Sequence, residues 1–252
     1  MSAPTNARLT GLHTRCQFTE TIRVPIAVIS TTLFPALSLL FFVVPQPFAQ
    51  DPQAATASAA QLAVFAVMSV CLFTYGVGVA EDRALPWDGY TRTLPVGPVP
   101  RLIGRVVNGL AFVVLGLAPL MLIAWWFTAA TLPPSRLALT AAALLVAGLP
   151  LFAIGISIGY SLFTMAALAV AQLLLLPLAF GGGLFLPPET FPGWLNSISM
   201  WLPTRAARDL VVTATTGVAL PGSTLLVLGV WTLLSCSLAV WAYRRDEGRR
   251  YQ

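Results

Sequence analysis

Apolar runs of membrane-spanning length alternate with short polar segments along the whole chain. A bilayer core about 30 Å thick needs about 20 apolar helical residues. We predict six spans, at about residues 24–44, 59–80, 106–130, 137–156, 164–180 and 222–243. The fourth and fifth spans are separated because no charge occurs from Leu137 to Pro188, a run too long for one span. We expect the turn between them around residues 157–163.

The distribution of arginine predicts the orientation of these spans. With six spans both termini lie on one side, together with eleven arginines: Arg8, Arg15, Arg23, Arg83, Arg92, Arg101, Arg105, Arg244, Arg245, Arg249 and Arg250. The other side holds three: Arg136, Arg205 and Arg208. Because cytoplasmic loops carry the excess of Lys and Arg, both termini are predicted to be cytoplasmic. The polar pieces are too short for a soluble domain, so residues 1–252 are expected to form one all-α domain, multi-pass in a bacterial cytoplasmic membrane.

The composition excludes several kinds of chemistry. A phosphate-binding loop needs a lysine, and all 14 basic residues of this chain are arginine. If ATP drives the protein, another polypeptide binds it. One histidine, His13, and three well-separated cysteines provide neither a catalytic dyad in the spans nor a metal site. The net charge of +5 comes from arginines beside spans, which is typical of membrane orientation and not of nucleic-acid binding.

The predicted spans also lack Asp, Glu, Arg and Lys, which disfavours coupling to protons or sodium. The candidate residues for a substrate path are the polar and aromatic ones within the spans, although each could serve ordinary helix packing instead. They are Tyr75, Tyr160, Gln172 and Trp231. Gly155 and Gly159 have the spacing that permits close helix contact.

Residues 81–105, "EDRALPWDGYTRTLPVGPVPRLIGR", gather charge, proline and aromatics between two spans. Between its prolines this segment can form a short helix with apolar contacts from Leu85, Trp87, Tyr90 and Leu94. Two interpretations stay open, a solvated loop and a docking surface. Interfaces are enriched in aromatics and arginine, which favours docking.

Two further segments are predicted to lie at the membrane surface. After the fifth span, Gly181–Gly183 breaks the helix, and an apolar helical stripe follows at Phe191, Trp194, Leu195, Ile198 and Leu202. This pattern indicates a short helix that lies in, or dips back into, the outer leaflet; a loop packed for stability is the alternative. The N-terminal residues have a ragged apolar face, which allows an interfacial helix or a disordered tail.

In length, span count and the order of these segments, the chain resembles the ABC-2 type permeases, which are the membrane subunits of a class of ABC exporters. The resemblance covers nearly the whole chain and includes an "E-x-R…G…R-x-L-P-V" segment and an "LP…P-x-W-L…LP" segment. The matching residues are Glu81, Arg83, Gly89, Arg92, Leu94, Pro95 and Val96, then Leu186, Pro187, Pro192, Trp194, Leu195, Leu202 and Pro203.

The resemblance implies two facing permease subunits, as a homodimer or with a sister permease, each docked on a separate cytoplasmic ATPase that carries the ATP and Mg. Residues 81–105 would couple the ATPase to the spans, with Glu81 and Arg83 at the lip of the gate and Trp87, Tyr90 and Arg92 against the ATPase. The full coupling set is Glu81, Asp82, Arg83, Leu85, Trp87, Tyr90, Arg92 and Leu94. Re-entrant helices within residues 181–209 would form the outer gate, with Gly182, Glu189, Phe191, Trp194, Leu195 and Ile198.

The closest resemblance is to the drug-resistance and nodulation-factor branch, which implies a hydrophobic or amphiphilic cargo such as an antibiotic. Apolar spans with few fixed polar groups suit such a cargo. Export of polysaccharide or lipid-linked glycan is the alternative within the family. Outside the family, one alternative is a non-transporting membrane scaffold. The other is a membrane enzyme, which the lack of a catalytic dyad or metal ligands in the spans disfavours. Membrane lipids are the remaining expected partners.

Overall fold

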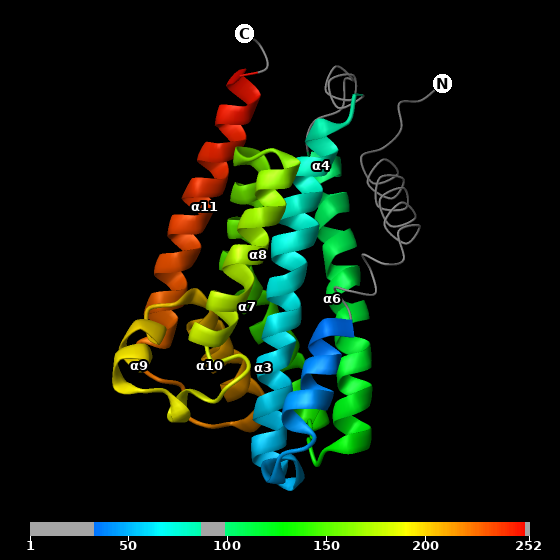
Figure 1. The fold of residues 1–252 in the computed structure, drawn as a ribbon, viewed down its shortest axis with the longest axis vertical. Coiled ribbons are helices and arrows are strands. Elements are labelled where there is room, and N and C mark those ends of the chain that lie inside the picture. The colour runs from blue at the N-terminus through cyan, green and yellow to red at the C-terminus, as the bar shows by residue number, and fades with distance from the viewer. Residues whose placement is uncertain (1–32, 87–98, 250–252) are drawn as a thin grey trace.

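A computed structural model describes residues 33–86 and 99–249 of the chain. Every regular element in those residues is a helix (Figure 1). Among the described residues, five helices are long and apolar enough to cross a membrane, and a shorter apolar helix covers Leu33–Val43. The long helices are the Pro52–Ala84 rod, α6 (Val99–Phe127), α7 (Pro134–Ser161), α8 (Thr164–Gly181) and α11 (Thr224–Arg249).

Five of the predicted spans are therefore confirmed as long apolar helices, with shifted ends. The second span is longer than the expected 59–80 because Asp51 caps its start, accepting the Ala54 N–H at 3.0 Å, with Pro52 in the first helical position. α7 continues through the expected turn to Ser161, and α8 resumes at Thr164. The first predicted span is described only from residue 33, and the predicted N-terminal interfacial helix lies outside the described residues.

The Pro52–Ala84 rod is the centre of the bundle. It consists of α3 (Pro52–Val70), a π-helical segment η3 (Cys71–Val77) and α4 (Gly78–Ala84), which follow one another without a break. The apolar window of the rod is 83% buried, whereas those of α8 and α11 are each 22% buried. At 1.5 Å per residue the rod is about 50 Å long, so it exceeds the bilayer core and reaches both ends of the molecule.

Glycine allows α7 to approach the rod at backbone contact. A Cβ atom at Gly155 would lie 2.0 Å from the Cys71 carbonyl oxygen, and one at Gly159 would lie 2.6 Å from the Val79 Cβ. These contacts fall on the π-helical η3 segment and on Val79 in the first turn of α4. The close helix contact expected from the Gly155–Gly159 spacing is confirmed.

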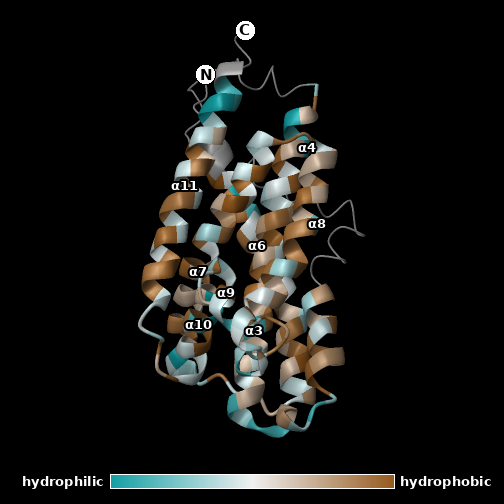
Figure 2. Cartoon of the chain, turned by 60° about the vertical axis from the view of Figure 1, so that its left-hand side comes forward, coloured by the Kyte–Doolittle hydropathy of each residue, from teal (hydrophilic) through white to brown (hydrophobic). Residues whose placement is uncertain are grey.

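Polar residues gather at the two ends of the bundle, and brown apolar residues cover the helices between them (Figure 2). At one end, here called the α4 end, α4, α7 and α11 finish and α6 and α8 begin (Figure 1). At the other, called the α9 end, the rod, α7 and α11 begin. There η2 (Pro47–Gln50) contacts the α6–α7 connection, the Ala129 N–H donating to the Ala49 carbonyl at 2.9 Å.

Two short helices fill the α9 end between α8 and α11. α9 (Gly193–Ser199) and α10 (Pro203–Thr216) form what we call the α9–α10 hairpin, preceded by η4 (Pro188–Thr190). The prediction of one helical stripe from Phe191 to Leu202 is wrong, because Phe191 precedes α9 and Leu202 precedes α10. Pro203 in the first turn of α10 starts a new helix there. Helix also continues beyond residue 209, where the predicted re-entrant segment ended.

We predict that Gly155→Ala destabilises the bundle, because the new methyl group would collide with backbone that cannot rotate away. Overpacking of this kind costs about 1–3 kcal/mol. Thermal unfolding in detergent would report a lower midpoint. Gly229→Ala in α11 is the matched control, since nothing lies within 4 Å of a Cβ at that glycine. Equal midpoints for the two variants would contradict the backbone contact.

Candidate functional sites at the two ends of the bundle

Arg83 joins three helices at the α4 end. Its Nη1 donates to the carbonyl oxygens of Gly159 at 2.7 Å and Leu162 at 3.1 Å, and its Nη2 forms an ion pair with Asp246 of α11. The carbonyls at the end of α7 have no helical partner, so the guanidinium caps that helix. With the Arg83 side chain 18% exposed and that of Asp246 5% exposed, water screens this ion pair only in part.

Two aromatic rings extend the contacts of Arg83. Its guanidinium carbon lies 5.8 Å from the centre of the Tyr160 ring, and Tyr160 meets Tyr243 of α11 edge to face at 5.1 Å. Tyr160, predicted as a substrate-path residue, thus lies beside Arg83 at the α4 end. Through these contacts, a displacement of α4 would also displace α7 and α11.

A second ion pair holds the start of α6. Arg105, whose side chain is 7% exposed, pairs with Asp82 of α4, and the Tyr75 hydroxyl donates to the Val106 carbonyl at 3.1 Å. Glu81 is exposed and Leu85 half-buried. The helices on both sides of residues 87–98 are therefore connected to the rod: α4 is part of it, and α6 is tied to it through Arg105 and Val106. The remaining predicted coupling residues, Trp87, Tyr90, Arg92 and Leu94, lie outside the described residues, and their role stays a prediction.

At the α9 end, a buried charge cluster connects the hairpin to the rod. Arg205 and Arg208 both bind Asp209 within α10, with N–O distances of 2.9 and 2.8 Å. With its amide oxygen oriented toward α10, Gln61 of α3 accepts from Arg208 Nη2 at 2.6 Å and Nε at 3.2 Å. One carboxylate thus neutralises one of the two guanidinium charges, and a neutral amide takes the other donors of Arg208.

The same cluster reaches α9. Arg205 Nη1 lies 3.4 Å from the Ser199 hydroxyl and 3.5 Å from the Asn196 side-chain oxygen. On α11, the Trp231 indole N–H donates to the Trp201 carbonyl at 2.7 Å, in the turn between α9 and α10. The hairpin is therefore held on two sides, by the rod and by α11.

Sequence reasoning placed Arg205 and Arg208 on the outer side and did not single out Asp209 or Gln61. The signal was present, since Arg205 and Asp209 are four residues apart and neighbour each other on a helix. The small residues Ala206 and Ala207 lie between them, and both are buried. A charged pair among small residues indicates a helix packed tightly on a polar partner.

The predicted outer-gate residues divide into two groups. Gly182 is buried where α8 meets α10: a Cβ there would lie 2.2 Å from the Thr204 hydroxyl oxygen, which itself donates to the Leu178 carbonyl at 2.8 Å. The others form the outside of the hairpin: Trp194 and Ile198 are 68% and 54% exposed, Glu189 is exposed, and Phe191 and Leu195 are half-buried. Their function as a gate stays a prediction.

The four predicted path residues have separate surroundings. Tyr75 packs edge-on against Phe152 of α7 at 4.5 Å, Tyr160 contacts Arg83, and Trp231 binds the hairpin. Gln172 lies exposed on α8. The structure does not bring these residues to a common surface, and a path along them stays a prediction.

Comparison with known proteins identifies the class that this architecture represents. The family model described as ABC-2 type transporter matches residues 10–215. The chain belongs to this family, as its resemblance predicted, and is thus a permease-type, multi-pass membrane protein of the bacterial cytoplasmic membrane. It is also 24% identical over 186 residues to "Putative transport permease YvfS" of Bacillus subtilis (strain 168), an alignment that covers 74% of this chain and 76% of that protein.

We predict that Arg83 and Asp246 are energetically coupled. Arg83→Gln and Asp246→Asn should each lower the unfolding midpoint, and the double variant should lose less than the sum. The coupling energy of residues in direct contact is about 0.5–3 kcal/mol. Glu247→Gln, one residue away and exposed, serves as the control partner for Arg83→Gln. Strict additivity of Arg83→Gln with Asp246→Asn would refute the coupling.

Asp209→Asn should be the most damaging conservative change in the hairpin, because it leaves the buried Arg208 and the partly buried Arg205 without a carboxylate. Breaking a buried ion pair costs about 3–5 kcal/mol. Thermal unfolding of the purified chain measures the loss. Glu189→Gln removes an exposed carboxylate that makes no ion pair within the described residues, and it should leave the midpoint unchanged. If both variants unfold at the wild-type midpoint, the cluster does not stabilise the hairpin.

Proposed function

We propose that this chain is the membrane-spanning subunit of an ATP-driven exporter, with ATP bound and hydrolysed by a separate subunit. Membership of the ABC-2 family supports the transport role. The absence of lysine supports the separate ATPase, since the phosphate-binding loop requires one. In this role the protein itself has no catalytic residue.

The observation that carries the proposal is that the two helices flanking residues 87–98 are joined to each other, α4 by Asp82 and α6 by Arg105. Residues 87–98 follow α4 in the chain, and the α6 helix that comes after them is tied back to α4 by the Asp82–Arg105 pair. A partner that pushes at this position is therefore expected to displace the rod. Helices are stiff along their axis, so the displacement reaches the α9 end.

At the α9 end the rod transmits this displacement to the hairpin. Gln61 on the rod holds Arg208 of α10, and Arg205 and Asp209 of the same helix lead on to α9. The proposed route therefore runs from the docked partner through α4 and α3 to Gln61 and α10, about 35 Å along the helix from Ala84 to Gln61. Movement of the hairpin then opens or closes the exit.

The proposed orientation places the α4 end in the cytoplasm. Arg83, Arg105, Arg244, Arg245 and Arg249 lie at the α4 end, against Arg136, Arg205 and Arg208 at the α9 end. This distribution follows the positive-inside rule, and it brings residues 87–98 to the compartment that holds ATP. The hairpin then lies at the outer face.

We propose a hydrophobic or amphiphilic cargo, such as an antibiotic, carried between two permease copies or between this chain and a sister permease. The exposed faces of α6, α8 and α11 are rich in Leu, Val and Phe or Trp, which suits a cargo that partitions into the membrane. Within the family the alternative cargo is a polysaccharide or lipid-linked glycan. A scaffold that docks partners without transport is the alternative function.

The test is affinity purification of the tagged chain from its own membranes in mild detergent, with identification of the proteins that co-elute. We expect an ATP-binding subunit at about one per chain. Trp87→Ala and Arg92→Ala should reduce its recovery by tenfold or so, because truncating a central aromatic or Arg anchor costs about 1–2 kcal/mol or more. The variants should still insert into the membrane.

Trp126→Ala is the matched control, a Trp that is 75% exposed at the opposite end, and it should not change recovery. ATP hydrolysis by the recovered complex, measured in liposomes with and without amphiphilic antibiotics, then tests the cargo class. A complex that lacks any ATP-binding subunit would instead support the scaffold. If a glycan and not an antibiotic stimulates ATP hydrolysis, the cargo is a polysaccharide or lipid-linked glycan.

A further inference from the structure

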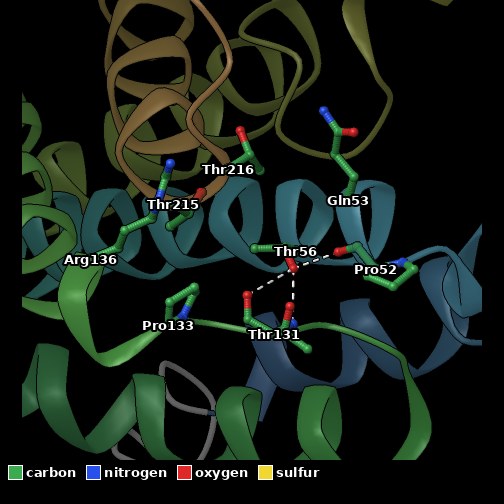
Figure 3. Close-up of a pocket in the computed structure, with 8 residues that line it drawn as sticks. All are labelled: Pro52, Gln53, Thr56, Thr131, Pro133, Arg136, Thr215 and Thr216. Carbon is green, nitrogen blue, oxygen red and sulfur yellow. Dashed lines mark hydrogen bonds between the residues drawn. The ribbon is translucent and has the colours of Figure 1, made fainter.

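A polar hollow of about 360 Å³ opens at the α9 end (Figure 3). It lies between the start of α3, the α6–α7 connection, the first turn of α7 and the end of α10. Its lining consists of Pro52, Gln53, Thr56, Thr131, Pro133, Arg136, Thr215 and Thr216. Neither the family resemblance nor the proposed route from α4 to the hairpin uses any of these residues.

Arg136 supplies the only positive charge among the residues that line the hollow. The other two arginines at the α9 end, Arg205 and Arg208, share Asp209. The Arg136 guanidinium has no carboxylate within 4 Å and no hydrogen-bond partner among the described residues. It rests instead against Gly217, at φ +80°, where a Cβ would lie 2.3 Å from Arg136 Nη2.

Two more side chains offer donors to the same space. The Gln53 amide and the Thr131 hydroxyl make no hydrogen bond within the described residues, whereas the neighbouring hydroxyls are engaged. The Thr56 hydroxyl oxygen lies 2.6 Å from the Pro52 carbonyl and accepts the Thr131 N–H at 2.9 Å, and Thr215 and Thr216 donate to carbonyls of α10. The available groups are thus a guanidinium, an amide and a hydroxyl from three elements, a donor set that suits an anion.

The local charges are consistent with an anion. Nearby, Asp51 uses its carboxylate to cap α3 through the Ala54 N–H at 3.0 Å, and it forms no ion pair with Arg136. The N-terminus of α7, which begins at Pro134, adds partial positive charge, and the C-terminus of α10 adds partial negative charge. These two partial charges offset each other, so the full charge of Arg136 makes the electrostatic potential in the hollow positive.

The depth of the hollow identifies the source of the anion. Trp125 and Trp126, 74% and 75% exposed at the end of α6, mark the level of the lipid headgroups. Thr131 follows five residues later, and Leu137 and Leu139, directly after Arg136 in α7, are exposed apolar residues. An anion held at headgroup depth beside apolar surface has the chemistry of a phospholipid phosphate.

We propose that the Arg136 hollow binds the phosphate of an anionic phospholipid in the leaflet at the α9 end. The planar guanidinium can donate two parallel hydrogen bonds to phosphate oxygens. Gln53 and Thr131 line other walls of the hollow, apart from the guanidinium (Figure 3), and both are exposed, so they offer donors to the rest of the lipid headgroup. A bound lipid would join the first turns of α3 and α7 to the last turn of α10.

The test is thermal unfolding of the full chain in mild detergent during titration with phosphatidylglycerol, phosphatidylcholine or inorganic phosphate. A ligand that binds only the folded state raises the midpoint in proportion to the logarithm of its concentration above Kd. We expect a clear rise with phosphatidylglycerol, a smaller one with phosphatidylcholine, whose choline cancels the net charge, and none with inorganic phosphate at equal concentration.

Arg136→Gln should weaken the response to phosphatidylglycerol by roughly tenfold in concentration, the size expected for a lost charge-assisted hydrogen bond. Asp51→Asn keeps the cap of α3 and removes a nearby negative charge, so it should strengthen the response. Arg245→Gln, at the α4 end, where Arg245 lies 5.0 Å from the Trp241 ring centre, is the control and should leave the response unchanged.

Identical phosphatidylglycerol titrations for wild type and Arg136→Gln would overturn the proposal, because the lipid would then act elsewhere. A midpoint rise with inorganic phosphate that depends on Arg136 would overturn the lipid as the source and make free phosphate the ligand. If Arg136→Gln does not fold, Arg136→Lys provides the comparison, because lysine keeps the positive charge but cannot donate two parallel hydrogen bonds to a phosphate. Native mass spectrometry should then find less retained phosphatidylglycerol on Arg136→Lys than on wild type, and equal retention would also overturn the proposal.

Discussion

The backbone contact between α7 and the η3 segment determines the arrangement of the whole bundle. Inside a membrane, apolar side chains gain little by leaving lipid for protein, so helices associate where their backbones can approach closely. Gly155 and Gly159 create that approach against the rod. With α7 fixed there, its remaining faces contact α10 and α11, and the rod lies against α6, α7, α8 and α10 (Figure 1).

The two ends of the rod are held by contacts of different character. At the α4 end, Asp82 has a side chain that is 34% exposed, so water can compete for the ion pair with Arg105. At the α9 end, Arg208 and Asp209 are 9% and 8% exposed and lie deep between helices. The Asp82–Arg105 pair is therefore more open to water than the contacts that hold the hairpin.

Much of the fold follows directly from the sequence, because a span is a local property. An uncharged run longer than two spans identified α7 and α8, and the spacing of Gly155 and Gly159 indicated their close contact with a neighbour. The ends of the helices were harder to predict from the sequence. The Asp51 cap, for example, starts the rod earlier than hydropathy indicates, because hydropathy does not register helix caps.

The candidate sites were harder to predict, because they depend on residues that meet only in three dimensions. Arg83 and Asp246 are far apart in the chain, and so are Gln61 and Arg208. The hairpin was the clearest error: its apolar residues fit one helical repeat, but Pro203 divides them between two elements. Periodicity records which residues could share a face and does not record where a helix restarts.

The buried charges of α10 have a consequence for the assembly of the protein. A charged side chain at the centre of a lone membrane helix costs about 2.5–3.5 kcal/mol, and α10 carries three such residues within five positions. Alone, this segment gains nothing by leaving water for lipid. Its place becomes favourable only when Gln61 and the α3 and α7 helices that α10 packs against are already present. We therefore expect the long helices to insert first and the hairpin to dock onto them afterwards, as a late step in the biogenesis of the molecule.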